Sequence, residues 1–259
     1  MAKVTFLGTG SSQGVPFIGC RCRVCSSEDW HDKRLRSSVM YETEGVRILI
    51  DAGPDFRYQM IRAGVRQIDG LLLTHEHKDH IGGIDELRAL NFVDYPTIRP
   101  IDIYATQHVL DTVRKDYDYA FVENKFKGVP ELNLKTIYPP APFEIKGVEV
   151  QPIMGQHSER FRVTGYRFGR FAYLTDFKTI EESEIERLMG VEILVVNALR
   201  GEPTLSHFCL SEALELINRI KPQRSYITHM SHDMGLYSEV NPQLPEGVSL
   251  AYDTLQIEI

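Results

Sequence analysis

Residues 74–83 read Thr-His-Glu-His-Lys-Asp-His-Ile-Gly-Gly, so three histidines and one aspartate follow the spacing His75-x-His77-x-Asp79-His80. The stretch comes directly after the apolar run Leu71-Leu72-Leu73, which is typical of a buried strand that ends in a polar loop. Neutral imidazole is the commonest metal ligand in proteins, and carboxylates suit hard divalent cations. A bound metal would offset the desolvation penalty of so many polar groups beside a buried strand. We therefore expect a metal site here rather than a solvated, charged loop.

Three more candidate ligands lie far downstream, each at the end of an apolar segment. His157 follows residues 150–156, Asp176 follows residues 172–175, and His229 follows residues 226–228. A single histidine is more often a hydrogen-bonded structural residue than a ligand, so each position is weak evidence alone. Ligands that converge from several strand ends on one edge are, however, what a hydrolase with two metal ions requires.

Length and composition exclude several classes of protein. The 259 residues allow one large domain or two small ones, and 42% apolar and 25% charged residues are ordinary for a globular protein. No apolar stretch approaches the length of a membrane span, and the N-terminus lacks the apolar core of a signal peptide. We therefore expect a cytoplasmic protein without a membrane partner. The net charge of −7 makes nucleic acid an unfavoured partner.

Apolar periodicity indicates strands in both halves of the chain, with helices between them. Clear strands are expected at 46–50 and 193–196, and clear helices at 107–116 and 210–220. No flexible linker and no solenoid-type repeat interrupts the pattern, which favours one layered α/β domain over residues 1–259.

The segment 117–142 has no clear period. It combines several aromatic residues with Pro130, Pro139, Pro140 and Pro142. Such a segment is either a mobile cover over a site or a surface loop packed by its own aromatic residues, and the sequence does not discriminate between the two.

Three of the four cysteines, Cys20, Cys22 and Cys25, fall within six residues. Disulfide pairing would leave one of the three without a partner, whereas the spacing suits thiolate coordination of a metal. Cys209 stands alone in a helical pattern, and we expect it to be a small buried apolar residue.

The order of these motifs resembles that of the metallo-β-lactamase superfamily. The His75–His80 motif, His157, Asp176 and His229 match its dinuclear metal pattern, and Asp51-x-Gly53 after the strand at 46–50 matches its first motif. The resemblance covers essentially the whole chain. It implies an α/β fold of the four-layer αββα sandwich type, in which two packed sheets are flanked by helices.

The resemblance also implies a division of labour among the ligands. His75, His77 and His157 would hold one metal ion, Asp79, His80 and His229 would hold the other, and Asp176 would bridge both. Asp51 would orient the histidine loop without binding metal itself. Nitrogen and oxygen ligands admit zinc or manganese, and also iron or nickel, so the sequence leaves the metal open.

The N-terminal region is similar to one subgroup of this superfamily. Gly8-Thr-Gly10, Val15-Pro16 and Gly19-Cys20-x-Cys22-x-x-Cys25 resemble the PhnP-like phosphodiesterases that act on phosphoribosyl 1,2-cyclic phosphate. In that subgroup three cysteines and one histidine hold a structural zinc, which would here involve a loop at about residues 19–32. His232 matches the subgroup's histidine, and His31 is the local alternative. We favour His232, because His31 stands among charged residues typical of an exposed surface.

The expected reaction is hydrolysis of a small phosphodiester, cyclic in that subgroup, by attack of a metal-bridging hydroxide. Asp79 would serve catalysis as a metal ligand. His207 matches a histidine that protonates the leaving group in related phosphodiesterases, a role that suits imidazole near neutral pH. Candidate phosphate contacts are Ser11, Ser12, Arg160 and Arg200.

Three other functions are weighed against this one. An RNA-processing endonuclease of the same superfamily is disfavoured by the acidic balance and by the lack of a basic, glycine-rich arm. A lactonase or thioesterase would use the same dinuclear geometry but would not call for His207 as an acid. A metal-stabilised binding module would not need an open dinuclear site. A homodimer is plausible in the PhnP-like subgroup.

Overall fold

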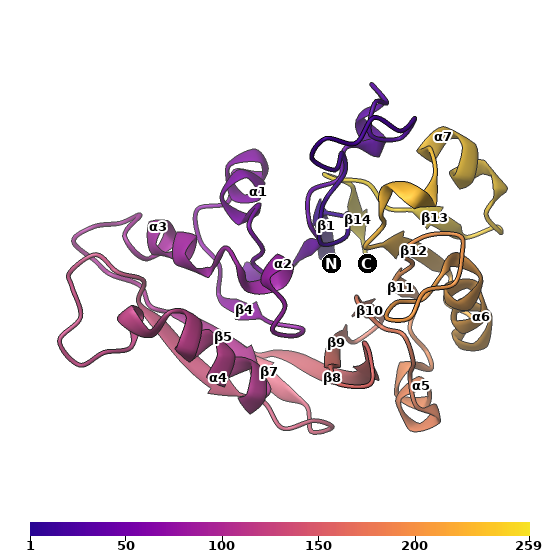
Figure 1. Ribbon diagram of the computed structural model, residues 1–259. Coiled ribbons are helices and arrows are strands. Elements are labelled where there is room, and N and C mark those ends of the chain that lie inside the picture. Colours follow the sequence, from indigo (N-terminus) through magenta and orange to yellow (C-terminus); the bar gives the residue numbers. More distant parts are fainter.

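The computed structural model describes residues 1–259 as two seven-stranded sheets that pack face to face (Figure 1). In spatial order, the first sheet consists of β14 (Gln256–Glu258), β1 (Ala2–Gly8), β2 (Ser38–Thr43), β3 (Val46–Ile50), β4 (Gly70–Leu72), β5 (Ile101–Ala105) and β6 (Leu132–Thr136). The second consists of β13 (Val248–Leu250), β12 (Arg224–Thr228), β11 (Ile193–Asn197), β10 (Phe171–Leu174), β9 (Arg162–Phe168), β8 (Val148–Gln156) and β7 (Phe143–Ile145).

Central strands of both sheets are buried on both faces. In β3, Ile48 and Ile50 belong to the core between the sheets, whereas Leu49 belongs to the core under the helices of the first half. In β11, Val195 faces the core between the sheets and Leu194 faces the helices of the second half. Because successive side chains of a strand point to opposite faces, burial of both faces requires an uninterrupted apolar run. The runs at 46–50 and 193–197 therefore identify strands in the middle of a layered fold.

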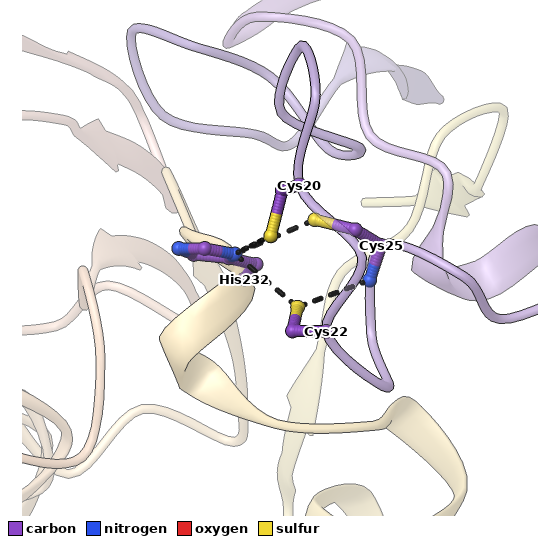
Figure 2. Close-up of side chains that lie close together, drawn as sticks. All are labelled: Cys20, Cys22, Cys25 and His232. Carbon is purple, nitrogen blue, oxygen red and sulfur yellow. Dashed lines mark hydrogen bonds between the residues drawn. The ribbon is translucent and has the colours of Figure 1, made fainter.

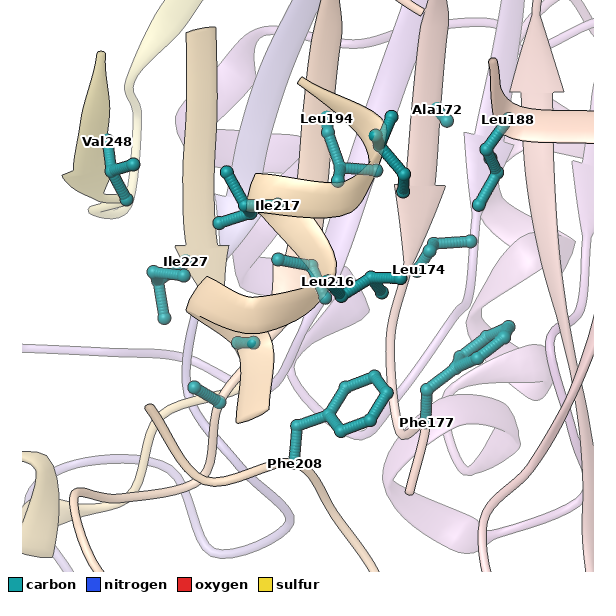
Figure 3. Packing of buried hydrophobic residues seen from close by; sticks show 14 of the residues in the cluster. Ala172, Leu174, Phe177, Leu188, Leu194, Phe208, Leu216, Ile217, Ile227 and Val248 are labelled. Carbon is teal, nitrogen blue, oxygen red and sulfur yellow. The ribbon is translucent and has the colours of Figure 1, made fainter. Parts of the chain in front are cut away.

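Helices cover the outer face of each sheet. Those on the first sheet are α1 (Phe56–Ala63), α3 (Leu87–Asn91) and α4 (Gln107–Asp116), and those on the second are α5 (Glu182–Leu188) and α6 (Leu210–Ile220). The two groups lie on opposite sides of the molecule (Figure 1). In Figure 3, Leu216 and Ile217 of α6 lie against Leu194 and Ile227 of the sheet. The expected four-layer αββα sandwich is confirmed.

Strand direction brings many loops to one edge of the sandwich. Strands β3 to β6 run parallel to one another, and so do β10 to β13. Strand β8 runs in the same direction as β10, because both are antiparallel to β9. In open α/β sheets, functional groups gather beyond the carboxyl ends of the parallel strands. The predicted ligands after β4, β8, β10 and β12 all lie at such ends.

The segment 117–142 forms the border of the first sheet. It holds a short 3-10 turn at Asp118–Ala120 and strand β6, which pairs in parallel with β5. The Tyr117 hydroxyl donates a hydrogen bond to the Ile81 carbonyl at 2.7 Å, which ties the start of the segment to the end of the histidine loop. The sequence pattern hides β6 because only alternate residues, Leu132 and Leu134, are apolar.

The remaining elements are short. They are α2 (Lys78–Ile81), α7 (Tyr237–Val240) and 3-10 turns at Trp30–Asp32, Ile84–Glu86, His232–Met234 and Asn241–Gln243. The long N-terminal loop between β1 and β2 lies beside α7, at the opposite end of the sequence (Figure 1). None of the helices is both long and apolar enough to cross a lipid bilayer.

Candidate metal centres

The predicted dinuclear ligands converge on one cluster. One ligand atom each from His75, His77 and His157 lies within 4.8 Å of the others, and the same holds for Asp79, His80, Asp176 and His229. Asp176 also groups with His157 and with His207 by this criterion. Its carboxylate therefore lies between the two sets of ligands, in the position expected of a bridging group.

Hydrogen bonds from the protein fix which nitrogen each imidazole presents. His80 donates from Nδ1 to Asp51 Oδ2 at 2.6 Å, and His157 donates from Nδ1 to the Ser206 carbonyl at 2.6 Å. Both rings therefore keep the Nε2 lone pair for the cluster. Such outer partners orient metal-binding histidines and set their tautomer. The prediction that Asp51 orients the loop agrees with this contact and with its bonds to Thr74.

Two hydroxyl groups orient the other buried rings. The Ser37 hydroxyl donates its proton to the Gly10 carbonyl at 2.9 Å. The same hydroxyl oxygen must therefore accept the hydrogen bond from His229 Nδ1, which lies 3.1 Å away. In the same way, the Thr74 hydroxyl donates to Asp51 and accepts from His75 Nδ1 at 3.0 Å. A hydroxyl has only one proton to donate, so once that proton is used, the hydroxyl oxygen acts as the acceptor for the histidine nitrogen.

His77 presents its other nitrogen. Its Nδ1 lies 3.0 Å from His75 Nε2, so these two nitrogens point at the same spot. Two bare nitrogens that face each other repel unless a proton or a cation lies between them, and ligands about 2.0–2.1 Å from a zinc ion lie about 3.0–3.4 Å from each other. The separation fits a shared metal ion.

The second set of ligands also requires positive charge. His80 Nε2 is fully buried without a good hydrogen-bond partner, and it lies 3.1 Å from Asp79 Oδ2 and 3.3 Å from Asp176 Oδ2. Burial opposes charging of the ring, yet Asp79 and Asp176 outweigh it and raise the pKa of His80 well above its ordinary value. A cation is therefore favoured at this point, either as a proton or as a metal ion. The donor set, imidazole with carboxylates, fits a divalent metal.

Three further groups, His157, Asp176 and His229, hold the protonation states that bind metal. Burial lowers the pKa of His229 to about 3 and also lowers the pKa of His157, so both rings are neutral at pH 7. Burial alone would raise the pKa of Asp176, but His229 and His80 more than offset it and hold that pKa well below its usual value. Metal ligands must be neutral imidazoles and ionised carboxylates, and the surroundings of these three groups favour those forms.

Three polar residues at strand ends adopt left-handed backbone conformations. These are Asp51 after β3 (φ 63°), Asp176 after β10 (φ 64°) and His229 after β12 (φ 56°). Residues other than glycine rarely adopt this region, and local strain of this kind concentrates at functional sites. The turn redirects each chain as it leaves its strand, so that Asp176 and His229 reach the cluster and Asp51 reaches the outer nitrogen of His80.

The loops that carry Asp51 and Asp79 are in close backbone contact. A Cβ atom on Gly53 would lie 1.9 Å from the Asp79 carbonyl oxygen, and one on Gly83 would lie 2.1 Å from the Gly53 carbonyl oxygen. Only glycine fits at these two points. The motifs Asp51-x-Gly53 and Gly82-Gly83 thus let the two loops pack together and set the position of Asp79.

His207 lies at the mouth of the cluster. Its Nε2 is 3.1 Å from Asp176 Oδ1, and its ring packs against the rings of His157 and His229 with centroids 4.5 and 5.1 Å away. The Ser206 hydroxyl lies 2.9 Å from its Nδ1, and the Thr204 hydroxyl bonds its backbone. The loop before α6 therefore holds this imidazole beside the ligands, with only 13% of its side chain exposed.

The three clustered cysteines meet one histidine, His232 (Figure 2). All four cysteines of the chain are free thiols. The Nδ1 atom of His232 lies 3.3 Å from the sulfur of Cys20, 3.3 Å from that of Cys22 and 3.4 Å from that of Cys25. In a tetrahedral zinc site with Zn–S of about 2.3 Å and Zn–N of about 2.0 Å, sulfur and nitrogen lie about 3.5 Å apart. The geometry therefore fits a closed Cys₃His site.

His31, the local alternative, points elsewhere. Its Nδ1 pairs with Asp29 at 2.6 Å, and its ring stacks on Tyr237 and packs against Trp30. His232 instead has Phe17 stacked on its ring at 4.2 Å, which holds it facing the thiols.

The thiols differ in their electrostatic surroundings. A hydrogen bond from the Cys25 backbone lowers the pKa of Cys22 to about 6, whereas burial raises the pKa of Cys25 to about 11. Three thiolates this close would repel one another without a cation between them. A zinc ion would supply that charge and would draw Cys25 into its ionised form.

One short segment connects the two centres. His229 faces the dinuclear cluster, and His232, three residues later, faces the cysteines. Between them, Met230 exchanges backbone hydrogen bonds with Thr9 and Ser11, and the buried Arg34 donates to the Ser231 carbonyl at 3.3 Å. The N-terminal loop is thereby tied to the edge that carries the ligands.

The predicted phosphate contacts do not form one group. Ser11 is buried beside Met230, and Ser12 is exposed, with its carbonyl accepting a bond from Arg36. The Arg200 guanidinium is held by the Pro203 carbonyl at 3.2 Å and lies 3.9 Å from Asp233. Sequence reasoning missed Ser37 and the Ser206 carbonyl, because only the fold brings them to His229 and His157.

Comparison with known proteins agrees with this geometry. Residues 46–230, which include every dinuclear ligand, match the family model described as "Beta-lactamase superfamily domain". The crystal structure of a "New Diphosphatase from the PhnP Family" superposes with a TM-score of 0.92 at 38% identity, covering 100% of this chain and 98% of that one. The Zn(2+)-bound PqqB of Methylobacterium extorquens shares the fold, with a TM-score of 0.79 at 21% identity over 99% of this chain and 100% of that one.

A curated relative carries a different name. It is an "Octanoyltransferase" of Porphyromonas gingivalis (strain ATCC BAA-308 / W83), which is 42% identical over 98% of this chain. The chain spans only 51% of that protein's length. The αββα fold, the ligand order and these matches lead to one conclusion: the chain belongs to the metallo-β-lactamase superfamily, and it resembles the PhnP family within it.

Proposed function

We propose that this protein is a metal-dependent phosphodiesterase that hydrolyses a small, cyclic phosphodiester. The observation that carries the proposal is the position of His207. His207 belongs to neither of the two predicted sets of metal ligands. Its Nε2 nevertheless lies 3.1 Å from the carboxylate of Asp176, which lies between the two sets. A phosphodiester with an alkoxide leaving group needs a proton donor beside the metals, and this is where His207 lies.

Each residue has a stated role in the proposal. His75, His77 and His157 would hold one divalent ion and Asp79, His80 and His229 would hold the other, while Asp176, whose carboxylate lies between the two sets, would serve both. When bound, such a pair of ions supplies Lewis acidity, which activates a water molecule and neutralises charge on the phosphate oxygens. Cys20, Cys22, Cys25 and His232 would hold a structural zinc ion, because four protein ligands complete a tetrahedral site and leave no position for substrate.

The protein groups contribute orientation and proton transfer. Asp51, Ser37 and the Ser206 carbonyl hold the ligand rings in one tautomer and one direction, so little reorganisation is required when substrate binds. His207 donates its proton from Nε2 to the departing oxygen and regains it from solvent at the mouth of the site. The Ser206 hydroxyl holds the opposite nitrogen and keeps Nε2 directed inward.

The names of the two relatives point to two reactions, phosphate ester hydrolysis and acyl transfer. The diphosphatase of the PhnP family acts on phosphate compounds by its name, and the present chain covers nearly all of that structure. The octanoyltransferase is twice as long as the region of similarity, so its name describes a larger protein. Thioester hydrolysis is the acyl alternative, and it would use the same metals without requiring an acid at His207.

Hydrolysis assays with defined metal content test the proposal. Protein loaded with manganese or zinc should hydrolyse bis(p-nitrophenyl) phosphate at least about a hundredfold faster than an octanoyl thioester. The reverse preference would replace the phosphodiesterase proposal with the acyl one. No hydrolysis of either substrate by protein that contains about two active-site metal ions would reject both.

Substitution of His207 tests the role of the acid. With a 2′,3′-cyclic nucleotide, whose alkoxide leaves poorly, His207→Ala should lower kcat about a hundredfold. With bis(p-nitrophenyl) phosphate, whose nitrophenolate leaves without a proton, the loss should be less than about threefold. Equal losses on both substrates, together with loss of metal, would assign His207 as a ligand instead.

A further inference from the structure

The buried hydroxyl of Thr175 contacts the carboxylate that lies between the two sets of ligands. Thr175 directly follows β10 and is fully buried, and its Oγ1 lies 2.6 Å from Asp176 Oδ2. A carboxylate that binds metal is ionised and can only accept hydrogen bonds, so the hydroxyl is the donor. A hydrogen bond to an ionised group is shorter and stronger than one between neutral groups. The contact is therefore suited to holding the carboxylate in one orientation.

The other polar neighbours of this carboxylate are imidazoles. Asp176 Oδ1 lies 3.1 Å from Nε2 of His207 and 3.1 Å from Nε2 of His229, and Oδ2 lies 3.3 Å from Nε2 of His80. His80 and His229 are predicted metal ligands. A metal ion would occupy the lone pair of each Nε2, so neither ring could then donate a hydrogen bond to the carboxylate. The Thr175 hydroxyl would remain as the donor to Oδ2.

The backbone beside the carboxylate is fixed independently of Thr175. The side chain of Asn197, at the end of β11, accepts from the Phe177 amide at 2.7 Å and donates to the Phe177 carbonyl at 3.0 Å. The same carbonyl accepts a hydrogen bond from the Phe208 amide at 2.7 Å, which ties this loop to the one before α6. The rings of Phe177 and Phe208 both belong to the core under the helices (Figure 3). What Thr175 controls is therefore the rotation of the carboxylate itself.

We propose that Thr175 is the positioning residue of Asp176, and that its hydroxyl fixes the orientation in which the carboxylate serves both metal ions. Thr175 then does for the carboxylate what Asp51, Ser37 and the Ser206 carbonyl do for the imidazoles. Outer partners of this kind typically change metal affinity or activity by about 10- to 100-fold. The inference rests on the proposed function for its effect on turnover, whereas its effect on metal binding is measured without substrate.

Manganese binding tests the role of the hydroxyl. Thr175→Val replaces the hydroxyl with a methyl group of similar size. Active-site metal is removed by dialysis against a chelator, and manganese(II), which suits carboxylate better than thiolate ligands, is titrated back while free manganese is measured by its electron paramagnetic resonance signal. The variant should bind manganese about tenfold more weakly than wild type. Thr175→Ser keeps the hydroxyl and should bind within about threefold of wild type.

Thr228→Val is the matched control. Thr228 precedes His229 as Thr175 precedes Asp176, in each case at the end of a parallel strand and before a residue with a left-handed backbone. Both threonines are fully buried, but Thr228 Oγ1 has no hydrogen-bond partner. Loss of this hydroxyl should leave manganese affinity unchanged. All four proteins are compared at least about 20 °C below their melting temperatures, so that every sample is folded.

Turnover separates positioning from substrate binding. With bis(p-nitrophenyl) phosphate and saturating manganese, Thr175→Val should lower kcat about tenfold and change KM less than about twofold, because the buried hydroxyl does not reach substrate. A KM that rises as much as kcat falls would assign Thr175 to substrate binding instead and overturn the proposal.

The binding data decide the proposal whether or not the protein is a phosphodiesterase. It is overturned if Thr175→Val binds manganese as wild type does, if Thr228→Val loses as much affinity, or if Thr175→Ser fails to restore it. Wild-type protein that binds manganese and hydrolyses no phosphodiester would reject the proposed function, and the affinities would still test Thr175. No manganese binding by wild type would reject both.

Discussion

The two metal centres differ in how they are assembled. The cysteine cluster takes three of its four groups from a loop of six residues and the fourth from His232. The dinuclear cluster takes its seven groups from loops beyond β4, β8, β10 and β12, and only two whole sheets can bring these together. One centre can therefore help to fold the loop around it, whereas the other depends on a fold that already exists.

They also differ in how their histidines are supported. In the dinuclear cluster, the buried rings of His75, His80, His157 and His229 each have the second nitrogen bonded by the protein. His232 has only Phe17 stacked on its ring and a long contact of 3.6 Å to Asp233. Strict orientation is expected where substrate must fit between metals, and it is less necessary where a metal simply links two segments.

The largest effect is expected from the bridging carboxylate. Asp176→Asn should lower kcat about a thousandfold or more, because the amide cannot neutralise two cations. The melting temperature should not fall and should rise slightly, because asparagine accepts the left-handed backbone at this position and removes a buried charge. Turnover, metal content by mass spectrometry and thermal unfolding are measured on the same sample. Retention of the cysteine zinc would show that the two centres bind metal independently.

The next largest effect is expected from a substitution in the cysteine cluster, and it should be an effect on thermal stability. Cys22→Ala should remove one zinc ion and lower the melting temperature by about 8 °C, which corresponds to about 3 kcal/mol for a domain of this size. Because His229 and His232 share one segment, the variant should also lose active-site metal more readily during dialysis against a chelator. An unchanged melting temperature together with unchanged zinc content would contradict the structural role.

A smaller effect is expected where the two loops touch. Gly53→Ala places a Cβ atom 1.9 Å from the Asp79 carbonyl and should destabilise the fold by about 2–3 kcal/mol. It should weaken the dinuclear centre and leave the cysteine zinc bound. Gly201→Ala is the control, because a Cβ atom there meets nothing within 4 Å. Equal destabilisation by both substitutions would show that the close contact is unimportant.

The smallest effect is expected from an outer partner. Ser37→Ala removes the acceptor of His229 Nδ1 and should weaken active-site metal binding about tenfold, with a change of less than about 2 kcal/mol in stability. Ser12→Ala, at an exposed serine of the same loop, serves as the reference. Metal affinity is read by competition with a coloured chelator. If both variants bind metal as wild type does, the hydroxyl does not orient the ring.

The sequence was informative where chemistry is local or where a strand is buried on both faces. The dense His75–His80 motif, the three clustered cysteines and the apolar runs at 46–50 and 193–196 each carry their signal within a few residues. Placement after apolar runs also singled out His157, Asp176 and His229. The helices at 107–116 and 210–220 match α4 and α6 because their apolar faces repeat with helical period.

The sequence was uninformative where a role depends on distant neighbours. Ser37 acts on His229 across 192 residues, and nothing in its surroundings distinguishes it from Ser38 beside it. The Ser206 carbonyl has no sequence signal, since every residue has a carbonyl group. Strand β6 was hidden within 117–142 because it lies at the border of its sheet, where only one face needs apolar residues.

The left-handed turns at Asp51, Asp176 and His229 have a consequence for the design of sturdier variants. Asparagine and glycine accept such turns more readily than aspartate or histidine does, so substitution at any of the three should relax the backbone. A screen for heat resistance alone would therefore select substitutions at these three positions, and the selected variants would lose activity. A screen that selects for metal binding as well as heat resistance would favour substitutions in the helices and outer loops, where a gain in stability does not reduce activity.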